Sequence, residues 1–351
     1  MKPPPVRLSH VEMYVSDAVA QAAYFSQRYG FQPVGRHGSP TAGSDHFSIA
    51  LQQGAIVIVL TQPCSPSHPG QTFLAAHGDG VADIALQVTP SSSVGEPVRT
   101  AAIRAFGNVR HTFVEGDAGS TGEAGVPGFE PFAPLATFAS LAPLVASTAT
   151  GLLSIDHFAV CLEAGSLEPT VAFYENVLGF SSIFEEKVTV GTESMASTVV
   201  QDDSRTVTLT LIEPAGGAAP GQIDHFLQQN GGAGVQHIAF STGDAVAVVK
   251  ELAGRGVEFL TTPRSYYAAL PQRISPAAHS VEALEELNIL VDADHDGQLF
   301  QIFTRSPYPR RTLFFEVIER RGARTFGSGN IKALYESVEA ERQQQTGGLD
   351  L

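Results

Sequence analysis

The chain has 351 residues, of which 43% are hydrophobic and 16% are charged, so two domains with sizeable cores are expected. A formal net charge of −15 makes nucleic acid and anionic membranes unfavourable partners, and a small anionic substrate would need a local positive centre to bind. Two cysteines, Cys64 and Cys161, exclude a disulfide framework and a thiolate zinc site. The absence of a long apolar run, at the start or elsewhere, predicts a soluble, cytoplasmic protein with no membrane span.

The chain contains two copies of one arrangement of strands and helices. In each copy a strand and a helix precede two further strands, and a short helix and a glycine turn then lead into another strand. The first copy is expected to contain a strand at 11–15, a helix at 18–29 and strands at 47–51 and 55–61. The second is expected to contain a strand at 155–160, a helix at 169–177 and strands at 197–201 and 206–212. Repetition of this order predicts a pseudo-symmetric α+β protein.

The boundary between the copies is expected in a segment of low complexity. Residues 115–151 are rich in Gly, Ala, Pro, Ser and Thr and carry few charges, which is typical of a connection between domains, here with a short helix at 138–145. We therefore predict an N-terminal domain at 1–150, including a linker from about residue 116, and a C-terminal domain at 151–351.

The two copies differ in their histidines. Aligning the opening strands places Met13 opposite His157, and aligning the strands after the glycine turns places Asp83 opposite His237. On this alignment the first copy has the framework but lacks both histidines. The chemistry is therefore expected in the C-terminal half.

Three strands of that half carry candidate metal ligands. His157 and His237 are 80 residues apart, and Glu316 follows after 79 more, inside the apolar stretch 312–318. Two imidazoles and one carboxylate are typical of ferrous oxygenases, and they leave three positions for dioxygen and the two oxygens of a 2-oxo acid. A single histidine in a strand is more often a core or edge residue, whereas a buried unpaired carboxylate is costly without a cation or a donor. The residues alone leave both interpretations open.

Four segments of the C-terminal half resemble the 4-hydroxyphenylpyruvate dioxygenase family, which is built on the vicinal-oxygen-chelate fold. They are 234–239 (GVQHIA), 298–304 (QLFQIFT), 313–318 (LFFEVI) and 326–330 (FGSGN). The resemblance implies two domains of repeated βαβββ modules, each forming an open, barrel-like mixed sheet, and only the second with a metal site. It implies Fe(II) held by His157, His237 and Glu316, dioxygen as co-substrate and the 2-oxo acid 4-hydroxyphenylpyruvate as substrate.

Members of this family differ in the carbon that they oxidise. The dioxygenases attack the ring and form homogentisate, and they usually carry Asn, Phe and Phe where this chain has Ile212, Ile331 and Tyr335. Loss of the Asn removes a polar group that could orient the substrate, and Ile331 leaves space beside the ring. These departures resemble the branch that hydroxylates the benzylic carbon to form 4-hydroxymandelate for hydroxyphenylglycine and glycopeptide antibiotics. Homogentisate formation remains the alternative.

The resemblance also implies a set of substrate contacts. Ser197, Thr210 and Gln301 match polar pocket positions of the family, although each could instead be an inward-facing residue satisfied by backbone. Residues 330–341 have the pattern of an amphipathic helix, which closes over the active site in the family. The full set of expected contacts is Ser197, Thr210, Ile212, Gln301, Phe315, Ile331 and Tyr335. For Phe315 and Ile331, plain core packing is the other interpretation.

Other patterns in the sequence predict no catalytic or metal-binding role. Residues 292–297 (DADHDG) resemble the start of a calcium-binding loop, but Phe303 stands at the twelfth position, where a glutamate is required, so a turn is expected. The histidines of the first half, His46, His68, His77 and His111, are expected at the surface or in loops. A non-catalytic protein of the same fold that sequesters a small ligand is an alternative of another class. The sequence is compatible with a homodimer.

Overall fold

The computed structural model describes residues 6–39, 43–88, 100–115, 126, 128–131, 148–190, 193–216, 220–327 and 329–330. Ile331 and Tyr335 lie outside these ranges, as do the helix expected at 138–145 and the helix expected at 330–341 beyond its first residue. None of the helices within the described ranges is long and apolar enough to cross a bilayer.

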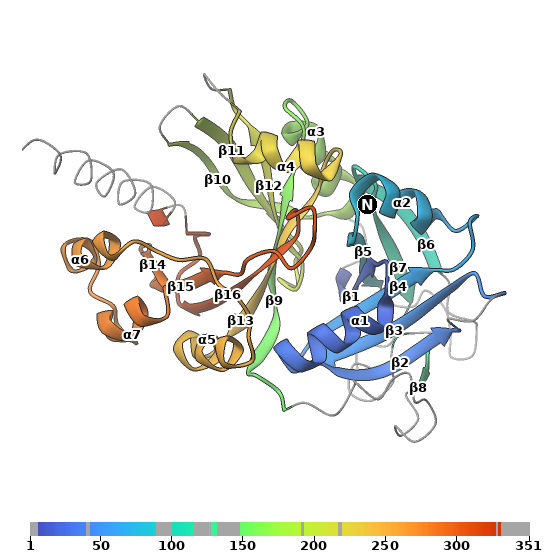
Figure 1. Cartoon of the computed structure of the whole chain (residues 1–351). Coiled ribbons are helices and arrows are strands. Elements are labelled where there is room, and N and C mark those ends of the chain that lie inside the picture. Colours follow the sequence, from blue (N-terminus) through green and yellow to red (C-terminus); the bar gives the residue numbers. More distant parts are fainter. Residues whose placement is uncertain are drawn as a thin grey trace, which may run out of the picture.

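The elements of the two halves follow one another in the same order at the start of each half (Figure 1). The N-terminal half contains β1 (Val6–Tyr14), α1 (Ala18–Tyr24), the π-helical turn η1 (Phe25–Tyr29), β2 (Gln32–Gly38), β3 (His46–Gln53), β4 (Ile56–Pro63), α2 (Pro69–His77), β5 (Gly80–Val88), β6 (Thr100–Phe106), β7 (Val109–Glu115) and β8 (Glu130–Pro131). The C-terminal half contains β9 (Leu152–Cys161), α3 (Leu167–Phe173), the π-helical turn η4 (Tyr174–Leu178), β10 (Ser181–Val190), β11 (Glu193–Gln201), β12 (Thr208–Pro214), α4 (Gln222–Asn230), β13 (Gly234–Thr242), α5 (Ala245–Gly254), α6 (Arg264–Arg273), α7 (Val281–Glu286), β14 (Leu290–Ala293), β15 (Gln298–Phe303) and β16 (Phe314–Arg321).

Within the described residues the strands form two eight-stranded mixed sheets, in which seven strands correspond in order and β8 and β14 have no counterpart. The orders are β6-β7-β5-β1-β4-β3-β2-β8 and, read in the corresponding direction, β14-β15-β16-β13-β9-β12-β11-β10. In both sheets the first strand of the half lies in the middle, parallel to one neighbour (β4 or β12) and antiparallel to the other (β5 or β13). Figure 1 shows the two sheets side by side, with α6 and α7 beside the β14 edge. The predicted pseudo-symmetric α+β fold is confirmed.

The first helix of each half ends in the same way, although only α1 begins with a side-chain cap. There the Asp17 side chain accepts hydrogen bonds from Val19 N and Ala20 N. Each helix then passes through its π-helical turn to a glycine in the left-handed region, Gly30 at φ 81° and Gly179 at φ 71°. At Gly30 a Cβ would lie 2.6 Å from the carbonyl oxygen of Thr148, so a side chain there would collide with the chain that enters the second half.

One continuous hydrophobic core joins the two halves. Phe25 and Tyr29 at the end of the first helix pack edge-on against Phe315 of β16, with ring centroids 5.5 and 5.4 Å away. Phe315 in turn stacks on Phe240 of β13 at 5.5 Å. The strands that carry two of the candidate ligands are therefore supported from behind by side chains of the other half.

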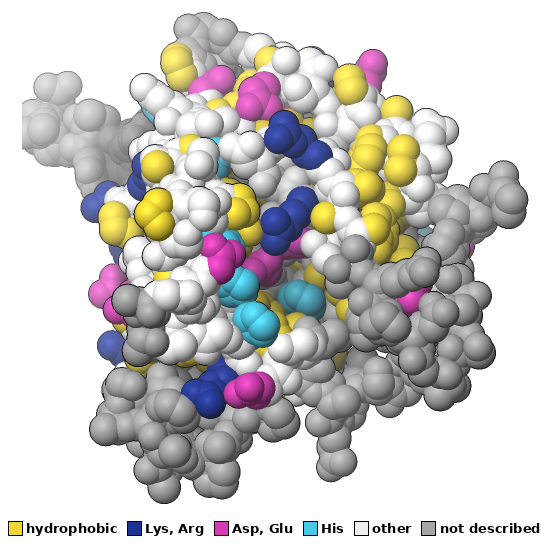
Figure 2. Space-filling model, turned by 90° about the vertical axis from the view of Figure 1, so that its right-hand side faces the viewer, with side chains coloured by type: hydrophobic (Ala, Val, Ile, Leu, Met, Phe, Trp, Pro, Cys, Tyr) yellow, Lys and Arg dark blue, Asp and Glu magenta, His cyan; other side chains and the backbone are white. Residues whose placement is uncertain are grey.

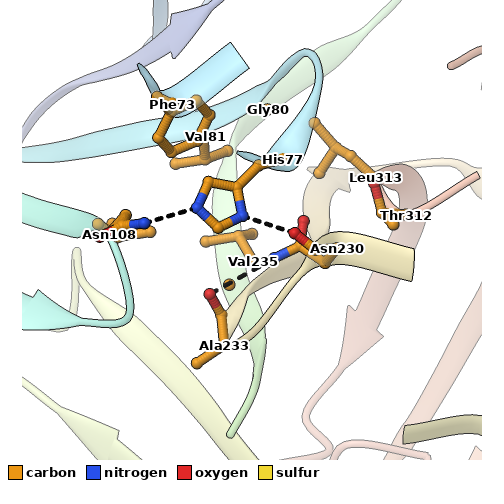
Figure 3. A pocket seen from close by; sticks show the side chains of 12 residues that line it. Phe73, His77, Gly80, Val81, Asn108, Asn230, Ala233, Val235, Thr312 and Leu313 are labelled. Carbon is orange, nitrogen blue, oxygen red and sulfur yellow. Dashed lines mark hydrogen bonds between the residues drawn. The ribbon is translucent and has the colours of Figure 1, made fainter. Parts of the chain in front are cut away.

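His77 and His111, expected at the surface or in loops, are instead buried in α2 and β7 where the halves meet. His77 donates from Nδ1 to the carbonyl of Asn230 (2.6 Å) and accepts from Asn108 at Nε2 (2.7 Å), beside a cavity with room for about one water molecule (Figure 3). His111, fully buried, accepts from the hydroxyl of Tyr174 across the junction (2.9 Å). The expectation for this pair is wrong because both rings bridge elements far apart in the chain. The turn expected at 292–297 is confirmed, since it joins β14 to β15.

Candidate metal centre

The three candidate ligands lie on adjacent strands of the C-terminal sheet, in the order β9, β13 and β16. The strand registers pair Ala239 with His157 on one side and with Glu316 on the other. His237, two residues before Ala239, points to the same face because side chains alternate along a strand. The small side chain of Ala239 leaves room between the larger ones, so all three converge on the concave face.

The geometry of these side chains fits one metal ion. Oε2 of Glu316 lies 3.2 Å from Nε2 of His237 and 3.5 Å from Nε2 of His157. Two donor atoms that each bind one ion at about 2.1 Å, with a donor–metal–donor angle of about 90–110°, lie about 3.0–3.5 Å from each other. Exposed fractions of 3% for His157, 9% for His237 and 2% for Glu316 leave a buried carboxylate facing two imidazoles.

The bonding of His237 supports the same interpretation. Among the described residues its Nδ1 has no hydrogen-bond partner, and its Nε2 faces Oε2 of Glu316 at 3.2 Å. Burial lowers the pKa of His237, although the Glu316 carboxylate opposes this shift. The ring is therefore neutral, the form in which imidazole binds metals.

His157 is held from behind by an ion pair. Its Nδ1 donates to Oδ1 of Asp156 (2.8 Å), and Arg320 donates to both oxygens of that carboxylate, from Nε at 2.7 Å and from Nη2 at 2.8 Å. Burial would raise the pKa of Asp156, but the hydrogen bonds from His157 and Arg320 outweigh it and hold the pKa well below its usual range. Metal-binding histidines usually donate from their other ring nitrogen to a carboxylate, a backbone carbonyl or water, and His157 donates to a carboxylate.

The ligand cluster forms part of the wall of a cavity of about 270 Å³. Of the expected substrate contacts, Ser197, Thr210, Ile212 and Gln301 line it. Phe315 does not, and its assignment as a cavity wall is wrong. Because neighbours on a strand point to opposite faces, Phe314 and Glu316 face the cavity while Phe315 enters the core.

Several residues of the site were not predicted from the sequence. Aromatic rings form much of the apolar wall: Phe184, Phe303, Phe314 and Phe326. The alternation around Glu316 could have identified Phe314, and Phe326 stands within a family segment. The pairing of Asp156 with Arg320 joins positions 164 residues apart and leaves no local signal.

The strand registers also correct the alignment of the two halves. His10 pairs with Ala85 as His157 pairs with Ala239, so His10, and not Met13, corresponds to His157. Asp83 corresponds to His237 as predicted. Asp83 pairs with Glu12, two residues after His10, and His237 pairs with Ala159, two residues after His157. The parallel between 10–15 (HVEMYV) and 157–162 (HFAVCL) could have revealed this register.

In the N-terminal sheet, the positive charge beside the acidic side chains comes from a guanidinium group. Arg110 on β7 donates to Asp83 at 2.5 Å and to Glu12 at 2.9 Å. Glu12 also accepts from Thr61 (2.7 Å), and burial lowers the pKa of the nearby His10 to about 4, so that its ring is neutral. The face of the molecule on the N-terminal side gathers histidine, acidic and cationic side chains (Figure 2).

Two other groups of metal-binding side chains occur in the described part of the chain, Asp45–His46–His68 and Asp244–His279–Glu319. In the first, Nδ1 of His68 accepts from Gly70 N, so its other nitrogen carries the proton of the neutral ring. In the second, Glu319 is already paired with His279 and with Arg321. Neither group offers three free donors.

The fold and this cluster define the class of the protein. Residues 154–302 match the family model of the Glyoxalase/Bleomycin resistance protein/Dioxygenase superfamily. More narrowly, the chain belongs to the 4-hydroxyphenylpyruvate dioxygenase family. It is 34% identical to 4-hydroxyphenylpyruvate dioxygenase of Dictyostelium discoideum, over 97% of this chain and 98% of that one. The Xenopus tropicalis enzyme of the same name is 32% identical, over 97% and 92%.

A solved structure is similar over the same length. It is a triple mutant of 4-hydroxymandelate synthase from Streptomyces coelicolor, with 37% identity, a TM-score of 0.81 and coverage of 97% of this chain and 100% of that one. The relatives thus carry the names of two activities within one dioxygenase family.

Proposed function

We propose that the protein is an Fe(II)- and O2-dependent enzyme that converts 4-hydroxyphenylpyruvate to 4-hydroxymandelate and CO2. The observation that carries the proposal is the meeting of His157, His237 and Glu316 at the wall of one cavity. These three residues would hold the iron, which supplies oxygen activation and the positive centre for an anionic 2-oxo acid. One oxygen atom of O2 enters the carboxylate formed at the former keto carbon, the other enters the benzylic carbon, and the original carboxylate leaves as CO2.

The chain contributes binding and orientation. Thr210 Oγ1 and Gln301 Oε1 are buried at the cavity and have no hydrogen-bond partner among the described residues. A buried polar atom without a partner is costly, so both are assigned to substrate contacts. Ser197, on the neighbouring strand, is assigned the same role. The rings of Phe303 and Phe314 give the cavity the apolar wall that an aromatic substrate requires.

The choice of the benzylic carbon rests on the departures from the dioxygenase pattern. Ile212 lines the cavity beside Ser197, its partner on the adjacent strand. At the position of Ile212 a dioxygenase usually offers an Asn amide to the substrate. Without that amide the ring is free to turn and present its benzylic carbon. Ile331 and Tyr335 support this choice by family resemblance alone. The similarity to the 4-hydroxymandelate synthase structure favours it, whereas the relatives named 4-hydroxyphenylpyruvate dioxygenase support homogentisate as the alternative.

Product identification tests the proposal. Homogentisate and 4-hydroxymandelate are isomers, and both reactions consume one O2 and release one CO2, so neither mass nor oxygen uptake separates them. Purified protein supplied with Fe(II), ascorbate, oxygen and 4-hydroxyphenylpyruvate is expected to give 4-hydroxymandelate, identified by chromatography against both standards and by NMR. Homogentisate as the main product would overturn the choice of carbon. Binding of the substrate without oxygen uptake would indicate a ligand-sequestering protein.

A further inference from the structure

Arg320 reaches in two directions from the end of β16. We propose that Arg320 is a positioning residue that holds His157 through Asp156 and also joins this histidine to the Phe326 wall of the cavity, so that ligand and wall keep one fixed arrangement. The inference rests on the proposed metal site and adds a residue that does not itself touch metal or substrate. It lies on the same face of β16 as Glu316, four residues earlier.

The first direction leads to the metal ligand. Two parallel hydrogen bonds from Arg320, at 2.7 and 2.8 Å, fix the plane of the Asp156 carboxylate. That carboxylate accepts from His157 Nδ1 at 2.8 Å. The proton of the neutral ring is thereby kept on Nδ1, which leaves the lone pair on Nε2, the atom that faces Glu316.

The second direction leads to the cavity wall. Nη1 of Arg320 donates to the carbonyls of Thr325 (2.6 Å) and Ala323 (3.3 Å), and the guanidinium lies 4.8 Å from the centroid of the Phe326 ring. This ring meets His157 edge-on, with centroids 5.2 Å apart. Phe326 therefore contacts both the arginine and the ligand that the arginine positions.

Only an arginine fits this arrangement. Four hydrogen bonds and one ring contact radiate from a single planar group, whose side chain is 22% exposed. A lysine keeps the charge but is a point donor on a flexible stem, and it cannot bridge the carboxylate and the backbone at once. Arg320→Lys consequently separates loss of geometry from loss of charge.

The test uses Co(II) as the probe, because its binding and its visible absorption report ligand geometry without turnover. Arg320→Lys and Asp156→Asn in the full chain are expected to weaken Co(II) binding by about 10–100-fold and to change the spectrum. Arg324→Lys is the matched control: its side chain is 81% exposed and pairs with Asp296, so Co(II) affinity should stay within about twofold.

A double-mutant cycle tests the link to the wall. Phe326→Leu alone should weaken Co(II) binding, and its effect should be smaller in the Arg320→Lys background, since the two changes break one connection. Additive effects would overturn the link. An Arg320→Lys protein that melts at a lower temperature but binds Co(II) with wild-type affinity and spectrum would show a merely structural role and overturn the inference. If that variant does not fold, Asp156→Asn carries the same test from the other side.

The wild-type measurement separates this inference from the proposed function. Co(II) binding that is lost in His237→Ala supports the metal site itself. If His237→Ala leaves binding unchanged, the metal site fails. If His237→Ala abolishes Co(II) binding but the Arg320 and Asp156 variants bind Co(II) as the wild type does, the metal site stands and the positioning role fails.

Discussion

Glu316 is the residue whose charge the proposed site needs most. It is the one carboxylate among the three ligands, and it lies 2% exposed against two imidazoles. Glu316→Gln keeps the shape and removes the charge, so bound iron and product formation are expected to fall by at least about 100-fold, more than loss of an outer partner costs. Iron content per chain and product yield are the measurements.

A second buried glutamate on the same strand gives the control. Glu319 pairs with His279 and Arg321 and lies outside the cavity. Glu319→Gln should lower the melting temperature and leave the iron content near that of the wild type. Normal iron content in Glu316→Gln would contradict the ligand assignment.

Ile212 is the residue at which the choice of product can be altered. Ile212→Asn restores the amide that the dioxygenases usually carry, and it is expected to shift the product mixture toward homogentisate, because the amide can hold the ring in place. Ile212→Val keeps the wall apolar and should leave 4-hydroxymandelate as the product. The ratio of the two isomers by chromatography is the readout, and an identical ratio in both variants would place the selectivity elsewhere.

At the scale of elements, one side chain ties three strands of the N-terminal sheet together. Arg110 on β7 bonds Asp83 on β5 and Glu12 on β1. Arg110→Met leaves the buried Asp83 carboxylate and the partly buried Glu12 carboxylate without their cation. Loss of one partner of a buried pair costs about 3–5 kcal/mol, and because the Arg110 side chain is 37% exposed we expect about 2–3 kcal/mol, measured by denaturant unfolding.

Arg104→Met is the matched control. Arg104 is exposed on β6, opposite Arg110 on β7, and its replacement should change the free energy of unfolding by less than about 0.5 kcal/mol. Equal effects of the two substitutions would show that the carboxylates are satisfied by other groups.

The elements that were predicted, such as the opening strand and helix of each half, have local signals in the sequence. Apolar alternation, glycine turns and the repeated order of segments identified the strands and the duplication. Register is different, because it depends on which residues face each other across strands that are distant in the chain. The alignment of Met13 with His157 was three residues out for that reason, and Phe315 was assigned to the wrong face by one residue.

The candidate ligands were predictable for a related reason. His157, His237 and Glu316 each interrupt an apolar strand and stand in segments that resemble one family. Their partners were not predictable: Asp156 has no signal apart from its neighbour His157, and Arg320 joins it only through the three-dimensional fold.

At the scale of the whole molecule, the two halves share one core. Phe315 packs against Phe25 and Tyr29 of the N-terminal half and on Phe240 of its own half. Phe315→Ala should lower the free energy of unfolding by about 3–5 kcal/mol, the usual cost of a buried phenylalanine, and should weaken metal binding because β16 loses its support. Calorimetry and Co(II) titration are the measurements.

Phe315→Leu fills most of the space and should lose less of both quantities. We expect the two halves of the wild type to unfold in one transition, since their hydrophobic core is continuous. Two separate transitions in the wild type would contradict this description of the junction.

The two sheets obtain their central cations from different sources. Arg110 is encoded in the gene and is present in every molecule as soon as it is translated. The cation proposed for the other sheet has to come from the iron supply of the cell. Removal of the metal would therefore leave the ion pairs of Arg110 intact in the N-terminal sheet and leave the buried Glu316 carboxylate of the other sheet without its counter-ion.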